Sequence, residues 1–296
     1  MPRKHLADDY DEEEMFGKME NPLTKYYRVP GVHVKLPTKG IFMPPGSIEP
    51  TLSGDIPVYP MRSADEMLLK SPDALMSGYA IEQLLRSCVP AIKLPRLIST
   101  PDLDVLLLAI RAATYGETIT LSPVCPQCGA ENQAQRNLSY LISNMTFVES
   151  DSPVRLTDEI VVYVRPYNLD NATKLGLASF EEARKLQAVE EAPAPERTAQ
   201  VSHSMQRLTA VANEIVADCI LRIVVPEGQV TDPQMIRGFM ANISKRWTDQ
   251  IQEKLEEINS RGIDKSYEIT CASCEHKWKA EIEFNPATFF EASSSA

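Results

Sequence analysis

The chain has 296 residues, and its 41 acidic side chains against 30 lysines and arginines give a net charge of −11. This length is enough to bury a sizeable core, and the ordinary apolar content excludes a collagen-like or wholly disordered chain. The acidic balance argues against general nucleic-acid binding, and no apolar run reaches the roughly 20 residues of a membrane-spanning helix. The N-terminus has no apolar signal core, so we expect a soluble protein made inside the cell.

The N-terminal residues 1–25 are rich in acidic side chains that repel one another and bring little apolar surface. The acidic cluster consists of Asp8, Asp9, Asp11, Glu12, Glu13 and Glu14. This composition predicts a disordered, solvated tail. The alternative interpretation of the same residues is an acidic docking peptide for a basic partner.

Short strands are predicted next, followed by helices. Apolar and polar residues alternate over residues 32–36, and Ile56–Tyr59 is a second extended run interrupted by proline, as in irregular or edge strands. From residue 61 to 116 the apolar spacing is helical. Helices are predicted to begin near three N-terminal capping signals, at Ser63, Ser71 and Thr100.

Residues 168–262 are predicted to be mostly helical. A Pro/Ala/Glu-rich linker at residues 190–199 separates a first helix from a second, whose apolar stripe runs from Leu208 to Arg222. A long third helix is predicted over residues 233–262, because proline begins it and glycine ends it.

Two Cys-x-x-Cys pairs, each between strand-like segments, carry the clearest chemical signal. They are Cys125 with Cys128 and Cys271 with Cys274, and Gly129 after the first pair permits the positive φ of a tight knuckle turn. A knuckle directs two sulfurs to one point, and four thiolates are the tetrahedral set of a closed structural zinc site. We therefore predict that these four cysteines bind a structural Zn²⁺.

The two pairs are separated by 142 residues, far more than in a compact zinc ribbon. Compared with a loop of ~20 residues, this separation adds roughly 1.7 kcal/mol of closure entropy. Zinc binding in small structural sites contributes ~10–16 kcal/mol, so the metal outweighs the longer loop. The spacing predicts a zinc ribbon with a helical region inserted between its halves.

Other interpretations of the cysteines remain open. The four thiols also suit iron, two independent redox pairs or four unrelated free cysteines, and His276 is a competing ligand beside the second knuckle. Cys88 and Cys219 lie on apolar helix faces and are expected in the core. No catalytic or cofactor-binding motif is present, and a full thiolate set leaves no open metal position, so we predict no enzymatic activity.

Several motifs occur in a characteristic order along the chain. They are Leu-Pro-x-x-Gly at 36–40, the helix entry at 60–71, Ile-x-x-Leu-Leu-x-Ser-Cys at 81–88, Tyr115-Gly116, the Cys-Pro-x-Cys-Gly knuckle at 125–129 and the returning cysteine pair. Together, over about residues 28–290, they resemble the baseplate hub-subunit and hub-assembly family of T4-type contractile-tailed bacteriophages. The resemblance implies a non-enzymatic role in building the tail baseplate.

We therefore predict a structural or assembly protein of the phage baseplate hub. Its expected partners are other baseplate and hub proteins, without a small-molecule substrate, nucleic acid or membrane. Its expected location is the host cytoplasm during assembly, or the baseplate of the virion tail. The alternatives are a zinc-ribbon nucleic-acid-binding or transcription-related factor, and a redox enzyme that uses its Cys-x-x-Cys pairs.

The predicted fold class is α+β: a zinc-ribbon-like β core with four cysteine ligands, N-terminal helices and a large α-helical insertion between the two knuckles. The predicted organisation is a disordered acidic tail at 1–25, an α+β region with the first knuckle at 26–166, the helical insertion at 167–262, the second knuckle at 263–290 and a frayed end at 291–296.

Overall fold

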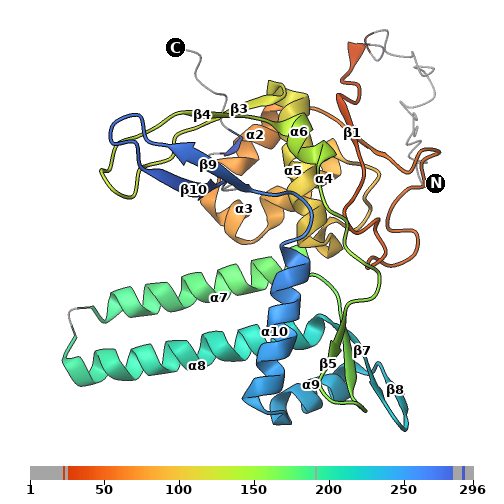
Figure 1. Ribbon diagram of the computed structural model, residues 1–296, viewed down its shortest axis with the longest axis vertical. Coiled ribbons are helices and arrows are strands. Elements are labelled where there is room, and N and C mark those ends of the chain that lie inside the picture. The colour runs from red at the N-terminus through yellow and green to blue at the C-terminus, as the bar shows by residue number, and fades with distance from the viewer. Residues whose placement is uncertain (1–22, 24–25, 191, 283–288, 291–296) are drawn as a thin grey trace, which may run out of the picture.

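The computed structural model describes residues 23, 26–190, 192–282 and 289–290 (Figure 1). Apart from Leu23, the tail predicted for residues 1–25 lies outside these residues, as does the frayed end predicted for 291–296. Helices and small antiparallel sheets both occur along the described chain, which is therefore α+β as predicted. None of the described helices is both long and apolar enough to cross a bilayer.

The first hydrophobic core surrounds helix α5 (Thr100–Tyr115). Leu106 and Ile110 lie on one face of this helix and Leu108 on the opposite face, yet all three are fully buried. A helix that is apolar on all sides is stable only when other elements enclose it. The helix ends at Gly116, whose φ of 92° is a conformation that glycine adopts without strain.

Short elements pack into the same core as α5. They are α2 (Ser63–Leu69), α3 (Pro72–Met76), α4 (Tyr79–Cys88), the 3-10 helix η2 (Pro95–Leu97), α6 (Leu138–Ser143), and β1 (Val32–Val34) paired antiparallel with β2 (Ile56–Val58). The predicted cap at Ser71 is confirmed, because its side chain accepts a hydrogen bond from the Ala74 N–H. Helix α2 begins at Ser63 as expected, but Arg62 and Asp65 provide its capping interactions.

Two antiparallel hairpins carry the Cys-x-x-Cys turns. The first is β3 (Thr118–Leu121) with β4 (Ala134–Asn137), and the second is β9 (Ser266–Thr270) with β10 (Lys277–Glu281). Ile119 and Tyr267, one from each hairpin, are buried in the core around α5. The Arg136 guanidinium on β4 also lies 4.4 Å from the ring centroid of Tyr267 on β9, so the two hairpins contact each other.

A second core lies between a four-stranded sheet and two helices. The sheet has the order β5 (Pro153–Arg155), β6 (Val161–Val164), β7 (Ile220–Val225), β8 (Gly228–Val230), and its helices are α9 (Pro233–Asn242) and α10 (Lys245–Asn259). Val162 and Ile223 of the sheet and Leu255 of α10 belong to this core. The region between the knuckles therefore contains strands as well as helices.

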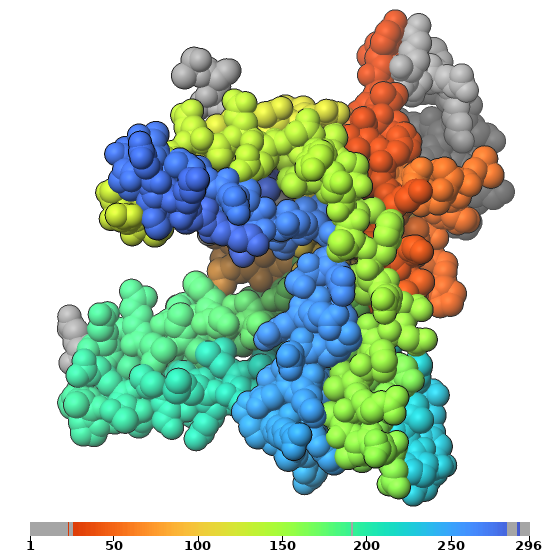
Figure 2. Space-filling model, in the orientation of Figure 1, coloured from red at the N-terminus to blue at the C-terminus, as the bar shows by residue number. Residues whose placement is uncertain are grey.

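Helices α7 (Leu169–Ala188) and α8 (Ala194–Asp218) form an antiparallel hairpin that projects from the rest of the molecule. Figure 2 shows a notch between this hairpin and the knuckle-bearing strands above it. Among the described residues 179–207, the only buried side chains are Glu182 and Ser204. The Ser204 hydroxyl donates a hydrogen bond to the Glu182 carboxylate at 2.7 Å. The outer part of the hairpin thus has a polar rather than an apolar interior.

Two helix predictions differ from the structure. The helix predicted to continue to Arg222 ends at Asp218, because Ile220–Val225 pairs with β6 as a strand. The single helix predicted over 233–262 is interrupted at Ile243, and Ser244 caps a new helix by accepting a hydrogen bond from the Trp247 N–H. Helix α8 also begins within the predicted 190–199 linker.

Candidate metal centre

The four cysteines of the two Cys-x-x-Cys turns lie together in the structure. The sulfurs of Cys125, Cys128, Cys271 and Cys274 are all within 4.8 Å of one another. The Cys125–Cys274 pair of sulfurs is 3.7 Å apart, and the Cys128–Cys271 pair is 3.6 Å apart. All four are free thiols rather than disulfides. The group can therefore bind one metal ion, with two ligands from each hairpin.

The two turns have matching backbone geometry. In the first, the Gly129 N–H donates to the Cys125 carbonyl at 2.9 Å, and in the second the Glu275 N–H donates to the Cys271 carbonyl at 3.0 Å. Both donors have positive φ, 73° at Gly129 and 59° at Glu275. Glycine adopts this conformation freely, whereas a residue with a side chain is strained there, and such strain concentrates at functional sites.

The distances between sulfurs fit a tetrahedral ion. Four sulfurs at about 2.3 Å from a central Zn²⁺ form a tetrahedron with edges of about 3.8 Å. The observed separations of 3.6 and 3.7 Å are close to that edge length. The first cysteine of each pair is buried, while Cys128 is exposed and Cys274 is partly exposed. The centre therefore lies at the surface, with one side against the protein.

Asn132 connects the two turns and is a residue that the sequence did not single out. Its buried side chain accepts a hydrogen bond from the Ala272 N–H at 2.9 Å, and its amide donates to the Ala130 carbonyl at 3.0 Å. The same amide group lies 3.8 Å from the Cys271 sulfur. Asn132 thereby fixes the second turn relative to the first.

The surroundings affect the individual thiols differently. Burial raises the pKa of Cys271, but the Ser273 and Cys274 backbone N–H groups stabilise its thiolate more strongly, so its pKa falls to about 6. A hydrogen bond from the His276 backbone lowers the pKa of Cys274, but the neighbouring thiols of the cluster, Cys128 above all, raise it to about 12. Crowded thiols hinder one another's ionisation, and a bound cation removes that penalty.

The remaining cysteines and the nearby histidine lie outside the cluster. Cys88 and Cys219 are fully buried in the two cores, as predicted, and burial raises their thiol pKa values to about 11 and about 12. The His276 ring stacks on Trp278 with centroids 6.1 Å apart. Within the described part of the chain, the four-cysteine group is the only cluster of three or more potential metal ligands.

Comparison with known proteins assigns the chain to a phage structural family. The family model described as T4 bacteriophage base plate protein matches residues 60–291. The match covers most of the chain, includes both cysteine turns, and shows that the chain belongs to this family. No curated protein and no solved structure matches the chain. Family membership confirms the predicted resemblance and implies contacts with other structural proteins of the phage tail.

Proposed function

We propose that this baseplate protein acts in the hub region of a contractile phage tail, as a structural or assembly component held by a four-cysteine zinc site. The observation that carries the structural part of the proposal is the convergence of four thiols from two distant turns. The order of motifs from Leu36 to Cys274, which resembles the hub-subunit and hub-assembly family, supports the hub region. The protein works through contacts with other baseplate and hub proteins.

Zinc is the proposed ion because the ligands are four sulfurs at tetrahedral spacing. Zn²⁺ favours this geometry in closed structural sites, in which no ligand position stays open for water or substrate. When bound, the ion would contribute folding free energy by joining the two hairpins, which then form the halves of one zinc ribbon. Such a site stabilises a rigid part and has no open position for catalysis, in keeping with a non-enzymatic role.

A reconstitution experiment tests the proposal. The full chain, co-expressed with the other baseplate proteins encoded in the same phage genome, is expected to enter a stoichiometric complex with hub proteins. The double variant Cys128→Ser/Cys271→Ser is expected to lose zinc and to enter that complex poorly. Cys219→Ala is the matched control, because Cys219 lies outside the cluster.

Two results would overturn different parts of the proposal. A complex with peripheral baseplate proteins but none with hub proteins would contradict the hub role and leave the zinc site unaffected. A fully assembled complex formed by a metal-free double variant would contradict the role of zinc and leave the hub contacts unaffected.

A further inference from the structure

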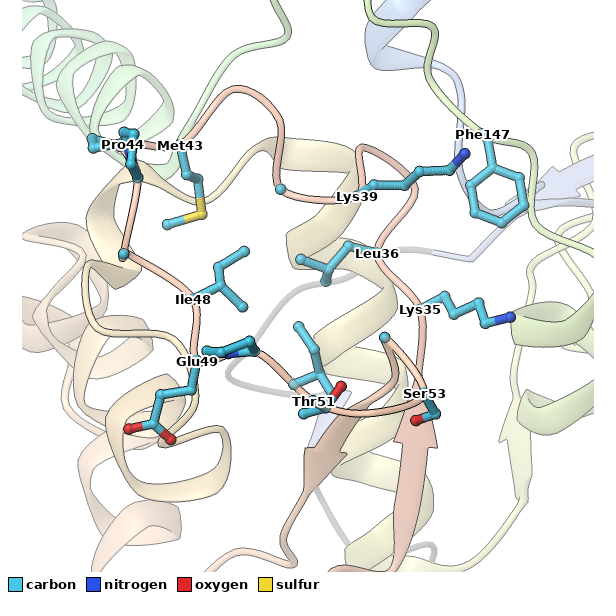
Figure 3. A pocket seen from close by; sticks show the side chains of 16 residues that line it. Lys35, Leu36, Lys39, Met43, Pro44, Ile48, Glu49, Thr51, Ser53 and Phe147 are labelled. Atoms are coloured by element: carbon cyan, nitrogen blue, oxygen red, sulfur yellow. The ribbon is translucent and has the colours of Figure 1, made fainter.

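A pocket of about 650 Å³ lies beside β1, away from the cysteine cluster (Figure 3). One continuous loop between β1 and β2 forms most of its wall, and Phe147 contributes from another segment. Leu36 and Met43 are buried at its apolar floor, and Ile48 is half-buried there. The volume is within the range of about 300–1,000 Å³ that is typical of binding pockets.

The loop that forms the pocket is held in place. Thr38 donates hydrogen bonds from its backbone N–H and from its hydroxyl to the Asp102 carboxylate at the start of α5, the first at 2.8 Å. Pro44, Pro45 and Pro50 restrict the backbone further. A wall that is fixed before a ligand binds loses little entropy on binding.

The pocket has an asymmetric charge. Figure 3 shows Lys35 and Lys39 on one side and Glu49 on the other. Glu49 is already paired with Lys93. No carboxylate among the described residues forms an ion pair with Lys35 or Lys39, although the Lys39 ammonium lies 5.3 Å from the centroid of the Phe147 ring. Two unneutralised lysines beside an apolar floor suit an acidic peptide with an apolar side chain.

We propose that this pocket binds the acidic segment of the chain's own N-terminus, residues 8–16, through Lys35 and Lys39. The segment lies outside the described residues and enters here only through its sequence. Six of the seven residues from Asp8 to Glu14 are acidic, and Tyr10, Met15 and Phe16 supply apolar side chains beside them. The charges complement the lysines, and an aromatic or methionine side chain suits the apolar floor.

The connecting chain is long enough for this contact. The nine steps along the chain from Tyr26 to Lys35 span at most about 32 Å, whereas the 12 steps from Glu14 to Tyr26 reach up to about 43 Å. The segment therefore reaches the lysine side of the pocket whatever the path of residues 26–35. A tether of this length also gives the segment a millimolar effective concentration, so it competes well with acidic segments of other proteins.

Carbodiimide cross-linking of the full-length chain, which joins carboxylates to amines that are in contact, tests the proposal. We expect cross-links from residues 8–14 to Lys35 and Lys39, at several times the yield to Lys277 and Lys279, which are exposed on β10 at the opposite side of the view in Figure 1. An equal mixture of ¹⁴N- and ¹⁵N-labelled chains separates links within one chain from links between chains. Equal yields at the four lysines, or links only between chains, would overturn the proposal.

Hydrogen exchange of full-length variants gives a second measurement. Lys35→Glu/Lys39→Glu is expected to speed amide exchange in the loop over residues 40–55 several-fold, whereas Lys35→Arg/Lys39→Arg preserves the protection. Replacing the six acidic residues from Asp8 to Glu14 by asparagine or glutamine is expected to speed exchange in the same loop to the same extent. Unchanged exchange in that acidic-segment variant would contradict the proposal, even if the lysine variant itself perturbs the loop. Lys277→Glu/Lys279→Glu is the matched charge-reversal control.

Discussion

The sulfur of Cys128 lies 3.6 Å from that of Cys271, although 143 positions separate the two residues. A backbone contact nearer to both turns lowers the entropy cost of bringing these two sulfurs together. Thr146 and Gly262 form an antiparallel bridge, with hydrogen bonds of 2.7 and 3.1 Å between their backbones. The intervening helices and sheet therefore leave and rejoin the first core at one place. The segments that close the cysteine cluster are consequently much shorter than the sequence separation.

Removing one cysteine ligand is expected to eliminate metal binding. Cys271→Ser replaces a buried thiol that a backbone N–H stabilises, so zinc retained after dialysis should fall close to zero. Because metal binding is coupled to folding, thermal unfolding should shift down by several degrees or more. Elemental analysis and calorimetry measure both effects. Cys219→Ala should keep its zinc, and loss of zinc in this control would contradict a site confined to the four clustered cysteines.

Asn132 is expected to tune metal affinity without being a ligand. Asn132→Ala removes the hydrogen bond to the Ala272 N–H and the contact with the Cys271 sulfur. Loss of such an outer partner commonly weakens metal binding about 10–100-fold. Competition with a chromogenic chelator measures the change. Asn144→Ala, at an exposed position on the end of α6, should leave affinity unchanged, and equal effects in both variants would contradict the positioning role.

Stability is expected to fall as the pH rises through the titration of Asp102. Burial raises the pKa of this carboxyl to about 7, against the opposing effect of hydrogen bonds from Thr38. The folded protein thus keeps a proton that the unfolded chain releases near pH ~4, so stability is greatest below that value. It declines by up to about 1.4 kcal/mol per pH unit until about pH 7.

Asp102→Asn isolates this effect, because its amide is neutral and still bonds to Thr38 through one acceptor and one donor. Burial also raises the pKa of Asp104, despite its 2.5 Å ion pair with Lys265. Asp104 is present in both wild type and variant, so its effect on stability cancels in the difference between them. Urea unfolding at several pH values should show the variant gaining stability relative to wild type from pH 4 to 7. Asp158→Asn, in an exposed turn, is the control. An unchanged difference across this range would contradict a protonated Asp102.

Gly78 is expected to be intolerant of a side chain. It begins α4 with φ of 70°, and an added Cβ would lie 2.5 Å from the Thr173 hydroxyl oxygen of α7. At Gly46, where φ is 80°, an added Cβ has no atom within 4 Å. Gly46→Ala should therefore lose only the roughly 1–2 kcal/mol of a left-handed conformation, and Gly78→Ala should lose more. Urea unfolding measures both, and equal losses would contradict close packing of α4 on α7.

The elements with clear local signals could be predicted from the sequence. Ser71 caps its helix, the strand near residue 162 is present, and Cys88 and Cys219 are in the cores. Strand β7 could not be predicted as easily. Its apolar residues continue the spacing of helix α8, so the same residues fit a helical stripe until pairing with β6 favours the strand.

The sequence predicted one contact between distant segments, the convergence of the two Cys-x-x-Cys pairs, because four thiols suit one metal ion. Other distant contacts leave no local pattern, and the hydrogen bond between Asn132 and the second turn crosses 140 positions of sequence. Residues 243–244 show a different limit. The helical spacing of apolar residues continues across the break between α9 and α10, so this spacing does not reveal the break. The only local signal is Ser244, which caps α10, and a single serine does not alter the apolar spacing.

The most direct test of the zinc site is elemental analysis of the full-length chain purified without added metal, together with X-ray absorption at the zinc edge. One zinc per chain, surrounded by four sulfurs at about 2.3 Å, is the expected result. A chain without bound metal, or a metal with nitrogen or oxygen ligands in place of cysteine sulfurs, would contradict the account.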